Sequence, residues 1–287
     1  MTVRNPVEWG WTQLGRAASV IGMAGPALHH IQETIHSPAP DVRRIGINDI
    51  REAIARGVDD FGAYRTDVVF VCLFYPIIGL VLARLAFTND VLPLLFPLAS
   101  GFAILGPFAA LGLYEMSRRR EQGQPATWAN ALDVLRAPSI GAIAVLGLIL
   151  VAIFLTWLGA AWMIYELTLG PASPVSIAAF ASDVLTTPAG WAMIALGMGV
   201  GFLFALLAMT VSIVSFPLLL DRDVGLDTAI RTSIRAVTMN PVPMAAWGLV
   251  VALALAIGSL PLFLGLVVVM PVLGHATWHL YRKVVAR

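Results

Sequence analysis

Residues 140–165, IGAIAVLGLILVAIFLTWLGAAWMIY, contain no charged side chain. About 20 apolar residues are enough for a helix to cross the hydrocarbon core of a bilayer, so this segment predicts a transmembrane helix. The composition agrees, since 59% of the 287 residues are hydrophobic and 12% are charged, with a mean hydropathy of +0.84. A soluble domain carries about 25% charged residues. The chain therefore holds more apolar surface than a single core needs.

Five further segments are expected to cross. The apolar run from Val242 to about Tyr281 is too long for one crossing at about 1.5 Å per residue. It contains GSLP at 258–261, a sequence that ends a helix, so we divide it there. The sequence thus predicts an all-α, polytopic protein with six spans, at residues 67–87, 91–114, 140–165, 191–220, 242–258 and 261–281.

The basic residues orient these spans. All but one of the 18 lie before the first span, between the second and third, between the fourth and fifth, or after the sixth. By the positive-inside rule these segments, and both termini, are expected to be cytoplasmic. The exception is Arg84, which we expect to extend toward the interface with Asp90 as its partner. A role of Arg84 in gating or anion binding is the alternative.

Three amphipathic segments are expected on the cytoplasmic face. In the first, Ile50, Ile54 and Phe61 lie near one helical face, and similar patterns occur at 128–135 and 226–237. Each segment precedes two spans, so the chain divides into three units, each an interfacial helix followed by a transmembrane hairpin. We interpret Asp59 and Asp60, on the first segment, as solvated ion-pair residues.

The ends of the second and sixth spans align without a gap, as GPFAALGLYEMSRR and MPVLGHATWHLYRK. Pro107 matches Pro271, and Tyr114 matches Trp278. A shorter version, SFPLLLDRD, contains Pro217. The pattern predicts a proline kink, an aromatic residue at head-group depth and then a cytoplasmic arginine. Internal duplication and chance convergence both explain the match.

His275 and His279 are four residues apart and share a helical face. We expect them to bind head groups or neighbouring helices near the interface. The alternative is metal or haem ligation, for which Glu115 is the best third metal ligand if the second and sixth spans end side by side.

The span interiors hold only weakly polar residues, which more often connect helices than form an ion path. Gly197 and Gly201 have G-x-x-x-G spacing, a pattern that allows close helix packing. The single cysteine, Cys72, excludes a disulfide framework, and no catalytic or nucleotide-binding motif is present. A net charge of +1 argues against a nucleic-acid partner. We expect no cofactor.

Residues 43–285 resemble an uncharacterised bacterial integral membrane family common in alphaproteobacteria. The resemblance rests on RRIGINDIREAIARGVDDF, FPLASGFAILGPFAALGLYEMSRRREQG, SFPLLLDRDVG and GHATWHLYRKVV. It implies an inner-membrane protein and supplies no catalytic residue. Some members are labelled as cytochrome c oxidase subunits, but this chain lacks the several intramembrane histidines of the haem-copper subunit, so such a role would be accessory.

Together these features predict a cytoplasmic leader at residues 1–42 and a six-span domain at 43–287. We expect a non-enzymatic accessory, assembly or scaffold subunit whose partners are the bilayer and other membrane proteins, with a respiratory complex as one candidate. A transporter or channel for a small neutral solute is the alternative, and metal or haem handling through His275 and His279 is a weaker one.

Overall fold

The computed structural model describes residues 34, 37–72, 77, 79–81, 84, 92–170, 174 and 176–286. Within these residues the fold is all-helical and has no strand, although an isolated β-bridge joins Val42 to Val285. The elements are α3 (Ile47–Cys72), η1 (Leu92–Leu94), α5 (Leu95–Ala109), α6 (Leu111–Glu121), η2 (Trp128–Arg136), α7 (Ile140–Thr168), α8 (Ile177–Thr186), α9 (Pro188–Ser212), α10 (Ser215–Asp221), α11 (Leu226–Met239), α12 (Pro241–Ser259) and α13 (Leu266–Val284).

Four helical segments among the described residues are long and apolar enough to cross a membrane. They are Leu92–Glu121, Ile140–Thr168, Pro188–Asp221 and Pro241–Ser259. These segments correspond to the second to fifth expected spans, and the expected break at 258–261 covers the last two residues of α12 and the start of the turn that follows. The expected first span, 67–87, lies mostly outside the described residues; its first six residues end α3. Helix α13, which covers most of 261–281, is not among the four candidates, because its second half is polar.

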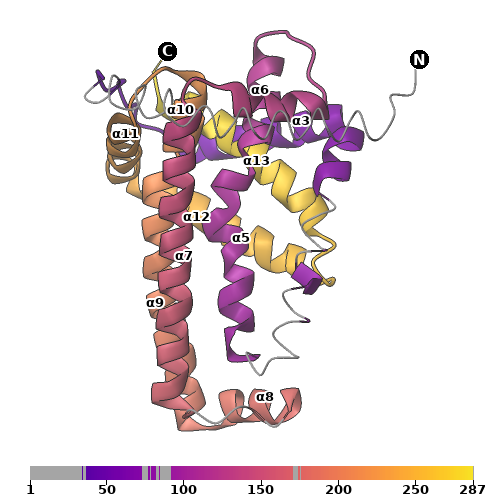
Figure 1. Cartoon of the computed structure of the whole chain (residues 1–287), viewed down its shortest axis with the longest axis vertical. Helices are drawn as coiled ribbons and strands as arrows, with labels where there is room; N and C mark the ends of the chain where they lie inside the picture. Colours follow the sequence, from indigo (N-terminus) through magenta and orange to yellow (C-terminus); the bar gives the residue numbers. More distant parts are fainter. Residues whose placement is uncertain are drawn as a thin grey trace.

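Helices α5, α7 and α9 run along the long axis of the molecule (Figure 1). Helix α8 lies across one end of this set. Helices α3, α6, α10 and α11 gather at the other end, together with the C-terminal end of α13. The α12–α13 hairpin starts and finishes at that same end, and its turn lies short of α8.

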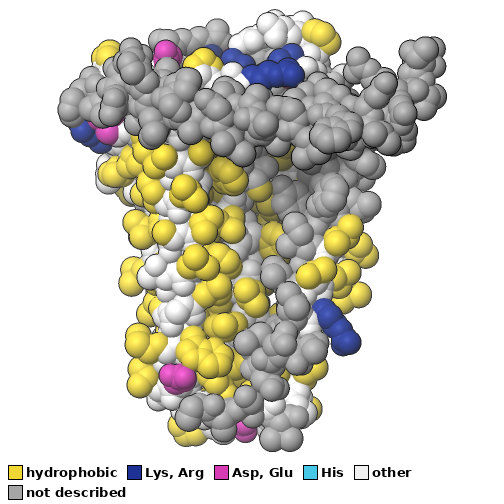
Figure 2. Space-filling view, in the orientation of Figure 1, with side chains coloured by type: hydrophobic (Ala, Val, Ile, Leu, Met, Phe, Trp, Pro, Cys, Tyr) yellow, Lys and Arg dark blue, Asp and Glu magenta, His cyan; other side chains and the backbone are white. Residues whose placement is uncertain are grey.

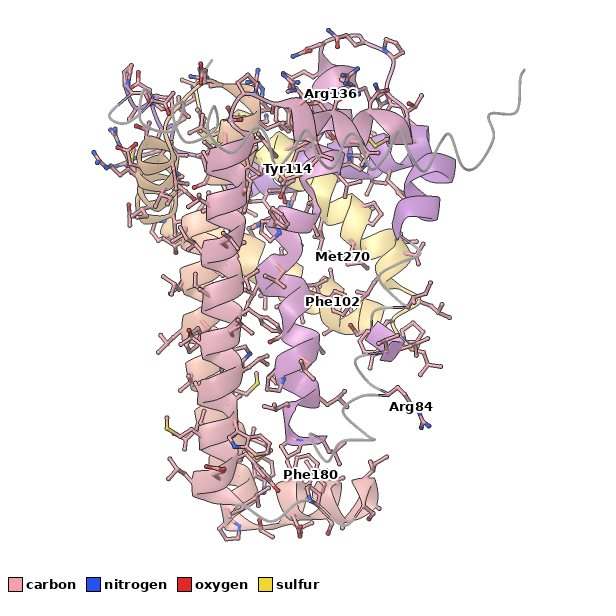
Figure 3. The ribbon with its side chains drawn as sticks, viewed as in Figure 1. Arg84, Phe102, Tyr114, Arg136, Phe180 and Met270 are labelled. Carbon is pink, nitrogen blue, oxygen red and sulfur yellow. The ribbon has the colours of Figure 1, made fainter. Side chains whose placement is uncertain are left out.

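Polar and apolar side chains divide along the same axis. In Figure 2, Lys and Arg side chains gather at the end that holds α3 and α6, and hydrophobic side chains cover the length of the helices below. Arg84 is apart from this group and points away from the ribbon (Figure 3). Its expected partner, Asp90, lies outside the described residues. We call the end that holds α3, α6, η2, α10, α11 and the end of α13 the basic end.

The two aligned span ends differ in backbone and surroundings. Pro107 lies inside α5, which ends at Ala109 before α6 begins, whereas Pro271 lies within an unbroken α13. Pro217 is the third residue of the short helix α10. Tyr114 is 1% exposed and Trp278 is 0% exposed. The prediction that these rings face lipid head groups was therefore wrong, because both side chains fill the core that α6 and α13 share with their neighbours.

The amphipathic segments also differ in part from expectation. Helix α3 buries Ile50 and Ala53 on one face, whereas the segment at 128–136 forms a 3-10 helix that buries Val134 and exposes Leu132. A 3-10 helix has three residues per turn, so an apolar pattern read at 3.6 residues per turn does not stay on one face. Helix α11 buries small and hydroxyl side chains: Thr228, Ala229, Thr232, Ser233 and Ala236.

Candidate functional site

A buried polar cluster joins three helices at the basic end. Asp60 comes from α3, Ser117 from α6, and His275 and His279 from α13. The Asp60 Oδ2 atom lies 2.5 Å from Ser117 Oγ and 2.8 Å from His279 Nε2. Ser117 Oγ lies 2.8 Å from His275 Nδ1. We call these four residues the Asp–Ser–His cluster.

Close packing of α3 against α13 brings the cluster together. A Cβ atom added at Gly57 would lie 2.7 Å from the Cβ and the backbone nitrogen of Ala276, so only glycine allows this approach. Asp60 is three residues after Gly57 and therefore lies on the same face of α3. His275 and His279, one turn apart, flank the crossing on α13.

Hydrogen bonding defines the protonation pattern of the cluster. Ser117 donates its single proton to Asp60, so it accepts a hydrogen bond from the Nδ1–H group of His275. In a neutral imidazole this leaves Nε2 of His275 without a proton. That atom is buried and has no hydrogen-bond partner among the described residues. Hydrogen-bond donation within the cluster therefore runs one way, from His275 to Ser117 and from Ser117 to Asp60.

The charge of Asp60 is balanced by Arg120, whose guanidinium nitrogen lies 2.5 Å from Oδ1. Burial acts to raise the pKa of Asp60, but the hydrogen bonds from His279 and Ser117, together with the electrostatic interactions with His279 and His275, outweigh it, so the pKa lies below its usual value. Asp60 is therefore a buried carboxylate held in its ionised form by its partners.

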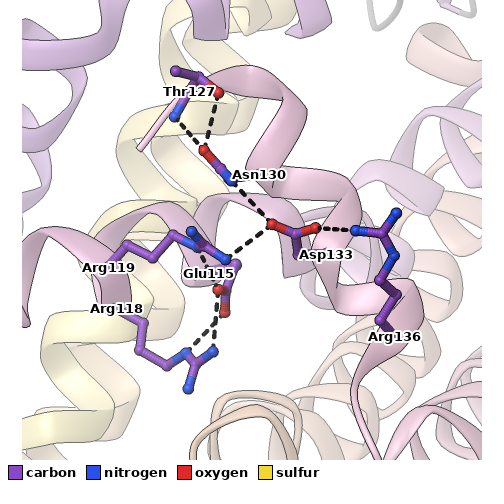
Figure 4. Close-up of polar contacts among 7 residues, drawn as sticks. All are labelled: Glu115, Arg118, Arg119, Thr127, Asn130, Asp133 and Arg136. Carbon is purple, nitrogen blue, oxygen red and sulfur yellow. Dashed lines mark hydrogen bonds and ion pairs between the residues drawn. The ribbon is translucent and has the colours of Figure 1, made fainter. Parts of the chain in front are cut away.

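A second ion-pair cluster fastens η2 to α6 (Figure 4). Glu115 is 2% exposed and accepts hydrogen bonds from Arg118 and Arg119, each at 2.8 Å. Arg119 also bonds Asp133 of η2 at 2.9 Å. Thr127, Asn130 and Arg136 complete this network around Asp133. A polar pocket of about 350 Å³ lies beside it and extends to α10.

A third set of contacts holds the end of α13. Trp278 Nε1 donates to Glu121, and Tyr281 donates to Asp221 at 2.7 Å. Arg282 pairs with both of these acids, at 3.1 Å each. At the last residue of α13 Arg43 N donates to Val284 O, and just beyond the helix Ala286 N donates to Asp41 O. The segment before α3 and the segment after α13 are therefore bound to each other.

Residues 94–221 match the family described as predicted integral membrane protein (DUF2189). The match includes the second expected span from residue 94 onward and the whole of the third and fourth, and three of the four candidate spans lie in this region. The chain is an integral membrane protein. No curated protein matches the chain. No solved structure matches it either.

In this integral membrane protein the three residues that we considered for a metal site separate into two groups. His275 and His279 lie beside Asp60 and Ser117, whereas both carboxylate oxygens of Glu115 are bound by arginines. Among the described residues, no group of three or more His, Cys, Asp or Glu is arranged to hold a metal ion.

Asp60 is the important residue that we misjudged. We interpreted it as solvated, but it is 4% exposed. A signal was present in the sequence: Ile50, Ala53, Gly57 and Asp60 follow a helical spacing of three, four and three, which places Asp60 on the buried face. Its partners could not be found in the same way, because they lie on α6 and α13.

The glycine pair on α9 has two different roles. A Cβ atom at Gly201 would meet the ring of Trp157 at 3.1 Å, so this glycine packs within the protein. At Gly197 a Cβ atom would meet nothing within 4 Å among the described residues. The two glycines of this membrane protein therefore do not form one packing surface for a single neighbouring helix of the chain.

Proposed function

We propose that the protein is a non-enzymatic accessory subunit that assembles with other integral membrane proteins in a bacterial inner membrane. The observation that carries this proposal is the outer surface of α7 and α9. It exposes large apolar side chains, such as Leu155 and Phe202, together with Gly159 and Gly199. A Cβ atom at either glycine would meet nothing within 4 Å in the described part of the chain.

Such glycines lower the stability of a helix, so we expect another group to pack closely against them. Glycine lowers helix stability by about 1 kcal/mol relative to alanine, and Gly159 and Gly199 do not permit a close contact within this chain. Small residues on a membrane helix let another helix approach closely. The surface of α7 and α9 therefore favours association with a helix of a partner protein.

The closed polar clusters support a structural role at the basic end. Ser117 and His275 are both 0% exposed, so a substrate has no direct access to the one Ser–His–Asp combination in the described residues. Asp60, the acid of the Asp–Ser–His cluster, is paired with Arg120 of α6 and His279 of α13. These contacts suit a fixed platform on which partners assemble.

The proposed topology has six crossings with both termini in the cytoplasm, arranged as three hairpin units. The basic residues at one end support the orientation. The pairing of residues 41–43 with 284–286 supports placing both of those segments on one side. In this topology 67–87 is the first crossing and α13 returns to the cytoplasmic side.

The proposal is tested by extracting tagged protein from its native membrane in mild detergent and identifying its partners on a native gel. We expect stoichiometric membrane partners, and the family resemblance makes respiratory oxidase subunits the first to look for. Gly199→Leu should reduce partner recovery at least fivefold. Leu203→Met, at an exposed apolar position on the same helix, is the control and should leave it unchanged. A lone band would contradict the proposal, and uptake of a neutral solute by the purified protein in liposomes would favour the transporter alternative.

A further inference from the structure

An apolar cavity of about 420 Å³ lies at the end of the molecule opposite the basic end. Its walls come from η1 and α5, from α7, from α9 and from α8. This volume falls within the range of about 300 to 1,000 Å³ that is typical of small-molecule sites. The cavity is bounded by three segments that are apolar enough to cross a membrane.

The wall of this cavity has no charged side chain. Its tryptophan, Trp157, uses its indole N–H in a hydrogen bond to Ser100 Oγ at 2.9 Å, and Ser100 in turn donates to Pro97 O. The polar atom of Trp157 is therefore satisfied by α5, and its ring presents an apolar surface. Tyr165 supplies the one side-chain hydroxyl among the residues that line the cavity, so an occupant must be uncharged and largely apolar where it contacts this wall.

Helix α8 covers the cavity without filling it. Ile177, Phe180, Ala181 and Val184 have helical spacing and all line the cavity. Phe180 is labelled on α8 in Figure 3. No residue of α8 is buried, however. The apolar face of α8 thus turns toward the ends of the spans and leaves unfilled space beneath it.

Gly197 maintains this space on the α9 side. It lines the cavity, and a Cβ atom there would meet nothing within 4 Å among the described residues. Gly199, two residues further along, has the same freedom but does not line the cavity. Both positions have room for a side chain, but only Gly197 faces the cavity. They therefore form a matched pair for substitution.

We propose that this cavity binds one acyl chain of a membrane phospholipid, taken from the leaflet at the α8 end. An apolar cavity does not attract water and binds apolar molecules instead, and an empty one leaves its lining without dispersion contacts. In a bilayer the apolar molecule at highest concentration is the lipid chain. Because the wall carries no cation, the site holds the chain and leaves the phosphate of the head group outside.

The test uses purified full-length protein in phosphatidylcholine nanodiscs that contain a small fraction of phosphatidylcholine with a diazirine in the middle of one chain. After illumination, cross-linked peptides are identified by mass spectrometry. We expect labelling of inward residues of the cavity, such as Phe180 and Met193, and saturation as the labelled fraction rises. Gly197→Leu, which places a side chain in the cavity, should reduce this labelling at least fivefold. Gly199→Leu should leave it unchanged.

Ala161→Leu narrows the cavity from the α7 side and replaces Gly197→Leu if that variant does not give a monodisperse protein. Equal labelling of Phe180 in the wild type and the filled variant would overturn the proposal. So would labelling confined to outward residues such as Leu203. Recovery of a different apolar molecule from the cavity, with no phospholipid cross-link there, would also exclude the phospholipid chain. Because the assay uses isolated protein, its result is independent of whether the protein has partners.

Discussion

His279 Nε2 lies 2.8 Å from Asp60 Oδ2, although 219 residues separate them in the chain. The contact joins the first described long helix to the last one. With Ser117 and Arg120 it makes Asp60 a shared acceptor for α6 and α13. The basic end is therefore held by a few long-range polar contacts as well as by apolar packing.

Asp60→Asn should strongly destabilise the protein. The substitution removes the buried carboxylate that Arg120 and His279 face, and a hydrogen bond to a charged group contributes about 1.5–3 kcal/mol. The free energy of unfolding is measured by SDS titration in mixed micelles. Asp59→Asn is the control, since Asp59 is exposed and its loss should have little effect. Equal stability of the two variants would show that Asp60 does not hold the helices together.

The stability of the protein should fall at acidic pH in a way that depends on Asp60. Because the pKa of Asp60 is lower in the folded protein than in the unfolded chain, its contribution is fully present above the unfolded pKa. It is lost as the pH falls through the folded pKa. Unfolding temperatures between pH 7 and pH 3 should show a smaller acid-side decrease in Asp60→Asn than in the wild type. Parallel curves would contradict this assignment.

Gly57→Ala should destabilise the crossing of α3 and α13. Its new methyl group would lie 2.7 Å from backbone and side-chain atoms of Ala276, and overpacking costs about 1–3 kcal/mol. Gly62→Ala, on the same helix, meets nothing within 4 Å among the described residues, so it should gain up to about 1 kcal/mol of helix propensity. Thermal unfolding in detergent shows whether each variant is less or more stable than the wild type. A stabilising Gly57→Ala would mean that the two helices are further apart than described.

Cysteine labelling should place the two ends of the molecule on opposite sides of the membrane. In a Cys72→Ser background, Gln124→Cys lies near the basic end and Ser182→Cys lies on α8. Both side chains are exposed. A membrane-impermeant maleimide should label Ser182→Cys in intact spheroplasts and Gln124→Cys only after lysis. The reverse pattern would invert the proposed orientation.

The sequence was sufficient to predict the long apolar helices and less informative about the basic end. Apolar length alone located α7 and α12, and GSLP located the break after α12. The role of His275 and His279 could not be predicted because their partners come from α3 and α6. The prediction that Tyr114 and Trp278 lie at head-group depth was wrong for a similar reason, since both rings are buried. Burial by neighbouring helices depends on how they pack, whereas the alignment compares only local sequence.

A double-mutant cycle with Asp60→Asn and His279→Gln tests most directly whether this contact fastens α3 to α13. The free energies of unfolding of the wild type, both single variants and the double variant are measured by SDS titration. Residues in direct contact show coupling energies of about 0.5–3 kcal/mol, so the double variant should lose clearly less stability than the sum of the two single losses. Additive losses would contradict a direct and stabilising contact between Asp60 and His279.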